Sequence, residues 1–151
     1  MPISSLPSPY GIGTLGKTAY EWIDFLKEAG QSWWQILPLG PTRYGDSPYQ
    51  SFSSAAGNPY LIDLDMLINE GLLEKSDVEK INWGQIPEKV DYGAIYNSRF
   101  AVLHKAYTNG KDKLSQEFSA FKEENKEWVE DYALFMALKK HFDMKSWLEW
   151  P

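Results

Sequence analysis

Residues 44–58 bring together side chains that could bind a carbohydrate. The segment reads YGDSPYQSFSSAAGN, in which two Tyr residues stand among Asp, Ser, Gln and Asn residues. A pyranose ring offers an apolar C–H face that stacks on an aromatic ring, and hydroxyl groups that need hydrogen-bond donors and acceptors. The same composition is also typical of a loop whose Tyr residues close over a scaffold and whose Asp, Ser and Asn residues make turns. Composition alone leaves both interpretations open.

Asp63 and Asp65 are the candidates for a catalytic pair. They alternate along an extended chain and so share a face, and glycosyl transfer with retention needs a carboxylate nucleophile close to a carboxylic acid. A simpler interpretation makes Asp65 the N-cap of a helix that begins at Met66. We favour capping, and the other neighbouring acidic residues fall on expected helix surfaces, where charges are normally solvated. The sequence therefore predicts no catalytic residues in this chain.

The composition excludes several classes of partner. The chain has 151 residues, 43% of them hydrophobic, which suits one globular unit, and a net charge of −6 without a basic stripe argues against nucleic acid. The longest apolar run, residues 33–39, is too short to span a bilayer, so no membrane partner is expected. His104 and His141 lack metal-ligand spacing, and no metal site is predicted. The chain has no Cys and its first residues lack signal-peptide features, which fits a cytoplasmic location.

The elements around the Tyr-rich segment form a helix, a strand and a long loop. Between residues 17 and 29 apolar side chains recur at helical spacing, and Gly30 stands where a left-handed cap is wanted. Residues 32–39, SWWQILPL, are short, bulky and apolar, which predicts a strand buried on both faces of a parallel sheet. Residues 40–59 follow as a loop, and loops of this length in compact domains are usually functional.

The rest of the chain is predicted to be helical. A short helix is expected near residues 66–69, followed by an irregular piece through residue 87. Three longer helices are indicated by apolar residues at helical spacing, and their positions are Tyr92, Ile95, Tyr96, Arg99 and Leu103, then Leu114, Phe118 and Phe121, then Trp128, Tyr132, Phe135 and Phe142.

Several blocks resemble one enzyme family in order and spacing. The blocks SSLPSPYGIGTLG, WWQILPLGPT, YGDSPYQSFSSAAGNPYLIDL and WVEDYALFMALKKHF are similar to the opening blocks of the 4-α-glucanotransferases called amylomaltases, glycoside hydrolase family 77. The resemblance implies an α/β fold, the N-terminal portion of a (β/α)8 barrel with a mostly helical insertion, incomplete in this chain. Residues 1–65 would give the first barrel elements and the glucan-binding loop, and residues 66–151 the insertion. It implies transfer of 1,4-α-glucan segments between maltooligosaccharides with no cofactor.

The resemblance also assigns roles to single residues. Tyr49 matches a tyrosine that stacks on the sugar of the donor subsite, and Ser47 matches a neighbouring rim residue. Asp46 and Asn58 correspond to supports for this loop. The chain departs from the family at residues 55–56, where two Ala residues replace an expected aromatic, which weakens the expected rim.

Tyr44 and Tyr96 resemble a pair that forms a secondary glucan-binding groove outside the active centre. Tyr96 also belongs to the apolar face of its predicted helix, so a packing role competes with the sugar-binding role.

The family's catalytic carboxylates lie on later barrel strands, and no residue here corresponds to them. A barrel of this type needs about 250 residues, and the family's first strand would precede Pro2. We therefore expect an N-terminal fragment that is inactive and only marginally soluble without the rest of the barrel. The alternatives are a non-catalytic glucan-binding module and a helical interaction protein.

Overall fold

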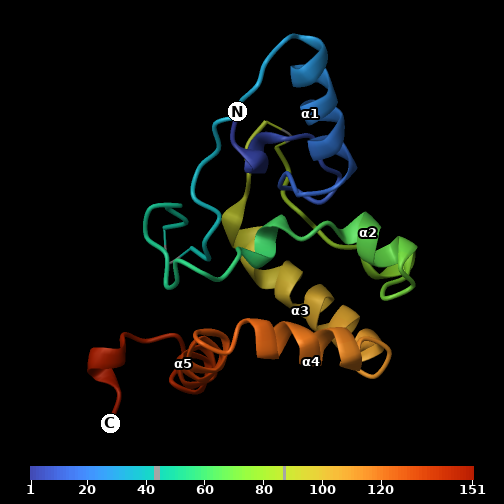
Figure 1. The fold of residues 1–151 in the computed structure, drawn as a ribbon. Helices are drawn as coiled ribbons and strands as arrows, with labels where there is room; N and C mark the ends of the chain where they lie inside the picture. The colour runs from blue at the N-terminus through green and yellow to red at the C-terminus, as the bar shows by residue number, and fades with distance from the viewer. Residues whose placement is uncertain (43–44, 87) are drawn as a thin grey trace.

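The computed structural model describes residues 1–42, 45–86 and 88–151 (Figure 1). Within these ranges helices make up the regular structure, apart from one isolated antiparallel bridge between Thr42 and Ser51. The helices in chain order are η1 (Ile3–Ser5), α1 (Lys17–Glu28), η2 (Pro59–Leu61), α2 (Leu64–Asn69), η3 (Lys75–Asp77), α3 (Tyr92–Gly110), α4 (Ser115–Glu124), α5 (Val129–His141) and η4 (Trp147–Glu149), where η denotes a 3-10 helix.

The predicted strand at residues 32–39 is not present in the described chain. The segment runs as an extended trace beside the N-terminal residues (Figure 1), and Trp33 is 92% exposed. A strand needs a neighbour whose N–H and C=O groups complete a ladder, and the described residues offer this segment no such neighbour. It is held at two points, where the Trp34 indole N–H donates to the Met1 carbonyl at 2.7 Å and where the Asn58 N–H donates to the Leu39 carbonyl at 2.7 Å. The described part of the chain is therefore helical and irregular rather than α/β.

The helix predicted at residues 17–29 is confirmed as α1. It ends at Glu28, and Gly30 follows with a φ of 73°, the left-handed conformation that glycine adopts without strain. Fewer of its apolar side chains are buried than the sequence predicts, since Ala19 is buried but Ile23 is exposed. Ala19 joins a small apolar cluster with Ile3, Leu6 and Leu61, so α1 packs on the N-terminal residues and on η2.

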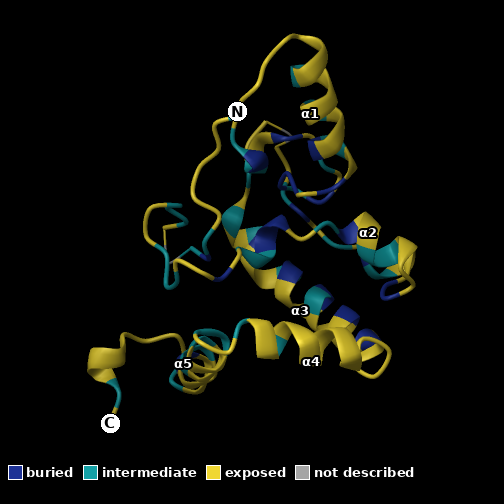
Figure 2. Cartoon of the chain, viewed as in Figure 1, coloured by how far each residue is buried: buried dark blue, intermediate teal, exposed yellow. Residues whose placement is uncertain are grey.

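A larger core lies between the N-terminal loop, α2 and α3 (Figure 2). Its buried members come from segments far apart in the sequence, and they are Tyr10, Ile12, Tyr60, Leu64, Leu72, Leu73, Val78, Trp83, Ile95, Val102 and Ala106. The Trp83 indole donates to the carbonyl of Val78 at 3.1 Å, which satisfies its buried N–H. This core fixes η2, and η2 follows directly after the Tyr-rich loop.

Helix α2 begins two residues earlier than predicted, and its N-cap is Asp63 rather than Asp65. One oxygen of Asp63 accepts from the Met66 N–H at 2.9 Å, and the other accepts from the Thr14 hydroxyl at 2.5 Å. Asp65 accepts from the Tyr10 hydroxyl at 2.5 Å. The prediction chose the wrong Asp because the partners Tyr10 and Thr14 lie about 50 residues away. Both carboxylates join α2 to the N-terminal loop.

The three longer helices are confirmed as α3, α4 and α5, but they differ in burial. Helix α3 buries one face in the larger core, whereas α4 has no buried residue and α5 has only Lys139 (Figure 2). None of the helices in the described ranges is long and apolar enough to cross a bilayer.

Candidate functional site

The candidate site is the loop of residues 45–58, which we call the tyrosine loop. Its base is closed by the Thr42–Ser51 bridge and by the Asn58–Leu39 hydrogen bond. Gly40 lies close beneath Ser51, and a Cβ at this glycine would stand 2.3 Å from the Ser51 Oγ. A side chain at residue 40 would therefore require Ser51 to shift, and glycine lets the loop base close as it does.

Asn58 ends the tyrosine loop and begins η2. Its side-chain oxygen accepts from the Tyr60 N–H at 2.9 Å, and Pro59 occupies the first helical position, where a missing N–H costs nothing. Since Tyr60 is part of the larger core, this cap fixes the loop exit to the core. Asn58 is therefore placed to support the loop, and its contact with a sugar stays a prediction.

Ser47 and Tyr49 form the exposed turn of the loop. The Gln50 N–H donates to the Ser47 carbonyl at 3.1 Å, and the Tyr49 N–H lies 3.4 Å from the Ser47 hydroxyl. The turn presents Tyr49 to solvent, and 74% of this residue is exposed. An aromatic ring this accessible is free to stack on an apolar face of a ligand.

Asp46 is half-buried at the start of the loop, with a φ of 55° that non-glycine residues rarely adopt. Burial raises the pKa of its carboxyl group, and the Thr42 hydroxyl partly offsets this by donating to it. Its negative charge also contributes to raising the pKa of Tyr60 and Tyr92, for which burial is the larger cause. Asp46 therefore faces the core side of the loop, as a supporting residue would.

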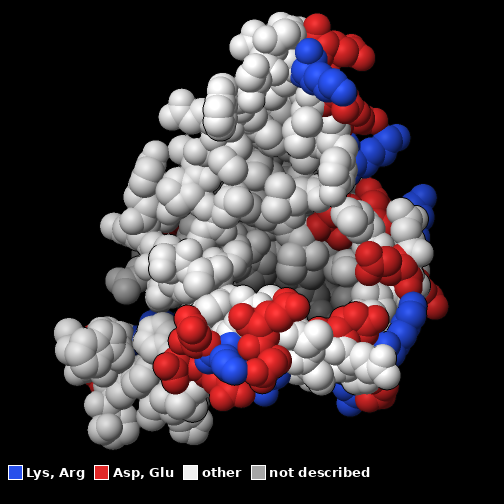
Figure 3. Space-filling view, viewed as in Figure 1, with Lys and Arg blue, Asp and Glu red and all other residues white. Residues whose placement is uncertain are grey.

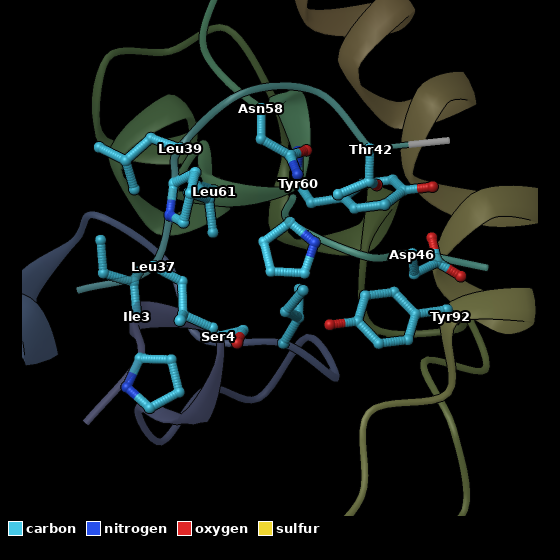
Figure 4. Close-up of a pocket in the computed structure, with 14 residues that line it drawn as sticks. Ile3, Ser4, Leu37, Leu39, Thr42, Asp46, Asn58, Tyr60, Leu61 and Tyr92 are labelled. Carbon is cyan, nitrogen blue, oxygen red and sulfur yellow. The ribbon is translucent and has the colours of Figure 1, made fainter. Parts of the chain in front are cut away.

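A cavity of about 80 Å³ lies between the loop and the N-terminal residues (Figure 4). Asp46, Asn58, Tyr60 and Tyr92 line it together with apolar side chains such as Leu37. Small-molecule sites usually enclose about 300 to 1,000 Å³, so this cavity is too small for a glucosyl unit.

Of the two tyrosines predicted to form a secondary groove, Tyr44 lies outside the described residues. Tyr96 is exposed on α3, and its ring meets that of Phe100 at a centroid distance of 5.8 Å. Phe100 in turn lies 5.8 Å from the ring of Tyr60, at the exit of the tyrosine loop. The buried face of α3 is carried by Ile95 and Arg99 rather than by Tyr96. The Tyr96 ring is thus accessible, as sugar binding would require.

Arg99 and Lys139 are buried cations whose roles the sequence analysis missed. The Arg99 guanidinium donates through Nη2 to the Ile62 carbonyl, and burial lowers its pKa to about 10. Its Nε and Nη1 atoms have no hydrogen-bond partner among the described residues. The signal for Arg99 was present, since a charged residue stood in the middle of an apolar helix face. Lys139 gave no such signal because Lys140 follows it, and the pair resembles a solvated helix end.

The two carboxylates considered as a catalytic pair, Asp63 and Asp65, serve the fold in this structure. Retaining glycosyl transfer uses two carboxyl groups roughly 5 Å apart across the scissile bond, but Asp63 and Asp65 are both engaged in hydrogen bonds within the fold. No group of three His, Asp or Glu residues among those described could hold a metal ion.

Comparison with known proteins assigns the chain to a family. A family model for glycoside hydrolase family 77, described as 4-alpha-glucanotransferase, matches residues 1–151. The chain is 57% identical over 150 residues to the 4-alpha-glucanotransferase of Clostridium butyricum, which covers 99% of the chain and 31% of that protein. It is 50% identical over 152 residues to the 4-alpha-glucanotransferase of Thermus thermophilus, covering 98% of the chain and 29% of that protein.

A solved structure also matches the fold of the chain. The amylomaltase from Streptococcus agalactiae in complex with acarbose superposes with a TM-score of 0.95 at 50% identity, over 99% of the chain and 30% of that protein. The chain thus spans about a third of the length of the relatives that it matches. On the whole-chain match and these identities, the chain belongs to glycoside hydrolase family 77, the 4-alpha-glucanotransferases.

Proposed function

We propose that this chain supplies part of the sugar-binding rim of a 4-α-glucanotransferase. The enzyme transfers 1,4-α-glucan segments between maltooligosaccharides by double displacement, in the cytoplasm, and its catalytic carboxylates come from parts of the protein beyond these residues. Family membership and the coverage of about a third of the related enzymes support this proposal. So does the complex of the Streptococcus agalactiae amylomaltase with acarbose.

The observation that carries the proposal is the exposed Tyr49 ring on a nearly uncharged surface. Within residues 45–58 Asp46 is the only charged residue, and it faces inward. Figure 3 shows charged side chains along the edge formed by α1 and α2 and over α4 and α5, whereas the side that carries the extended segment is almost free of them. A neutral surface with an accessible aromatic ring suits a neutral sugar better than a phosphate or a charged peptide.

The extended segment supports the proposed place of the chain in a barrel. Residues 32–39 expose Trp33, Ile36, Leu37 and Leu39 although their composition is that of a buried strand. In the proposed enzyme these residues are a barrel strand covered by its neighbours. Residues 1–65 then form the first barrel elements with the tyrosine loop, and residues 66–151 form a helical insertion.

One observation favours the second candidate, a non-catalytic glucan-binding module. The chain closes two apolar clusters of its own, and the larger one holds the exit of the tyrosine loop. A module that folds alone would bind maltooligosaccharides through Tyr49 without any transferase partner.

A chimera tests the proposed function. The matching segment of the Clostridium butyricum enzyme is replaced by residues 1–151, and glucan transfer from maltoheptaose is assayed. We expect an active chimera in which Tyr49→Ala raises KM about tenfold, the factor that corresponds to about 1.4 kcal/mol of lost stacking. Tyr20→Ala, at an exposed tyrosine on α1, serves as the matched control and should leave KM unchanged.

Two results would overturn the proposal. One is an inactive chimera that is folded by circular dichroism. The other is an active chimera in which Tyr49→Ala and Tyr20→Ala have the same KM. Binding of maltoheptaose by the 151-residue chain alone, followed by tryptophan fluorescence, would favour the binding module if it depended on Tyr49.

A further inference from the structure

Lys139 is buried on α5, with only 7% of its surface exposed. Lysine is almost never buried without a partner, because the ammonium group loses its hydration. Lys140, the next residue, is exposed, so burial is not a property of this helix end as a whole. Some other contact must therefore compensate for the burial of Lys139.

Two aromatic rings and one carbonyl surround the Lys139 ammonium group. The Nζ atom lies 5.1 Å from the ring centroid of Phe52 and 6.0 Å from that of Phe135, both within cation–π range. It also donates to the Lys145 carbonyl at 2.9 Å. Phe52 belongs to the tyrosine loop, whereas Phe135 belongs to α5, so the lysine joins elements 87 residues apart in the sequence.

The contact is part of an aromatic cluster. The rings of Phe52 and Phe135 lie 6.1 Å apart, and Trp150 lies 5.9 Å from Phe135 and 5.3 Å from Phe142. In Figure 1 the tyrosine loop lies next to α5, which is seen end-on. The loop is thus held at its exit by Asn58 and η2, and on another side by this cluster.

We propose that Lys139 is a positioning residue that holds the tyrosine loop against α5 through the ring of Phe52. Phe52 follows Ser51, which forms the bridge at the loop base, and lies three residues after Tyr49. A loop fixed at Phe52 keeps the Tyr49 turn in one place before a sugar arrives, and this preorganisation strengthens binding. The inference rests on the proposed glucan-binding role of Tyr49.

A purely structural role for Lys139 makes a different prediction. Through the Lys145 carbonyl the lysine also satisfies the backbone after α5, which is a common use of lysine at helix ends. If that were its only role, removing the charge would lower the melting temperature and leave sugar affinity unchanged. Phe52 helps to separate the two roles, because the hydrogen bond from Lys139 to the Lys145 carbonyl does not involve it.

The experiment uses the chimera with the variants Lys139→Met, Lys139→Arg and Phe52→Leu. We expect Lys139→Met and Phe52→Leu each to raise KM for maltoheptaose about fivefold to tenfold while kcat stays within about twofold, since the contact positions the loop and touches no reacting atom. Lys139→Arg should restore KM, because a guanidinium keeps both the charge and the donors. The double variant should be no worse than the poorer single variant, since both changes break one contact. Lys140→Met is the matched control and should leave KM unchanged.

A second readout does not depend on sugar binding. Chymotrypsin cleaves after exposed tyrosines, and cleavage after Tyr49 in the 151-residue chain should become about tenfold faster in Lys139→Met, because local opening of the loop then costs less. Lys140→Met should be cleaved at the original rate.

The outcomes separate the two proposals. A lower melting temperature with unchanged KM and unchanged cleavage in Lys139→Met would overturn the positioning role, as would a Phe52→Leu variant indistinguishable from the parent. If instead Tyr49→Ala leaves KM unchanged, the glucan-binding proposal fails, and the cleavage rate alone decides whether Lys139 holds the loop.

Discussion

Residues 1–110 and residues 111–151 are both rich in helix and in apolar side chains, yet they differ sharply in burial. Every buried apolar side chain of the described residues lies between Ile3 and Ala106. After residue 110 the one buried residue is Lys139, a cation (Figure 2). The two regions thus have the same local pattern and different tertiary surroundings.

The difference shows what an amphipathic pattern does and does not predict. Helix α3 buries its apolar face because the N-terminal loop and η2 lie against it. The rings of α4 and α5 pack mainly on one another and remain half-exposed, as in the edge contact of Phe121 with Trp128 at 6.3 Å and the tilted contact of Trp128 with Tyr132 at 6.2 Å. The spacing of apolar residues therefore predicts that a helix forms, whereas its burial depends on a partner that the pattern does not identify.

Removing one leucine from each region should give the largest contrast. Leu64 is 0% exposed, and we expect Leu64→Ala to lower the free energy of unfolding by about 3 kcal/mol because it leaves a cavity in the larger core. Leu134 on α5 is 60% exposed, and Leu134→Ala should change it by no more than about 0.5 kcal/mol. Urea unfolding of the two variants measures both values. Equal losses would mean that α5 is buried in solution, for example by association between copies, and the contrast between the regions would be lost.

Replacing the buried cation of the first region should cost as much as Leu64→Ala when a cavity is left, and less when the space is filled. Arg99→Ala should cost about 3 kcal/mol through the cavity that it leaves beside Trp83. Arg99→Met should cost only about 1 kcal/mol, because it fills the space and removes two buried nitrogen atoms without hydrogen-bond partners while losing one hydrogen bond to Ile62. Urea unfolding again supplies the measurement.

The size of the difference between the two Arg99 variants is the informative quantity. If Arg99→Met is as costly as Arg99→Ala, the charge itself stabilises the core, and the attraction of Asp63 becomes the explanation to test. Asp63→Asn would then reproduce part of the loss.

Local features of the fold could be predicted from the sequence, and features that depend on distant partners could not. The end of α1 just before Gly30, the long loop and the three later helices follow from residues close together in the chain. The N-cap of α2 was assigned to Asp65 because nothing nearby indicates that Thr14 and Tyr10 engage the two carboxylates. Residues 32–39 were predicted to be a strand because their composition is that of buried backbone, but no described segment pairs with them.

The same distinction between local features and distant partners applies to the candidate site. The residue types and order of the tyrosine loop point to a sugar, and Tyr49 is exposed as that role requires. The residues that support the loop could be predicted only where they act locally. Asn58 caps the helix that follows it, whereas the contact of Phe52 with Lys139 spans 87 residues and has no local signal. The roles of these residues toward a glucan remain predictions until the chimera is assayed.

The smallest effect is expected at alkaline pH, where tyrosines in both regions contribute. Burial raises the pKa of Tyr60 from 10.0 to about 12, and the neighbouring charge of Asp46 adds to the shift. Burial also raises the pKa of Tyr132, which has no carboxylate contributing to the shift. Because the folded state holds the Tyr60 proton more tightly than the unfolded state, stability is complete below pH 10 and falls as the pH rises from about 10 to about 12.

Tyr60→Phe should therefore flatten the loss of stability above pH 10, and Tyr132→Phe should flatten it less. The slope will not vanish in Tyr60→Phe, since burial also raises the pKa of Tyr10 and Tyr92 in the same region. Urea midpoints between pH 8 and about pH 11 measure the slopes, because the difference in bound protons between the two states sets each slope. If Tyr132→Phe changed the slope more than Tyr60→Phe, the folded state would hold the Tyr132 proton more tightly than the Tyr60 proton. Residues 111–151 would then contain the better-buried tyrosine.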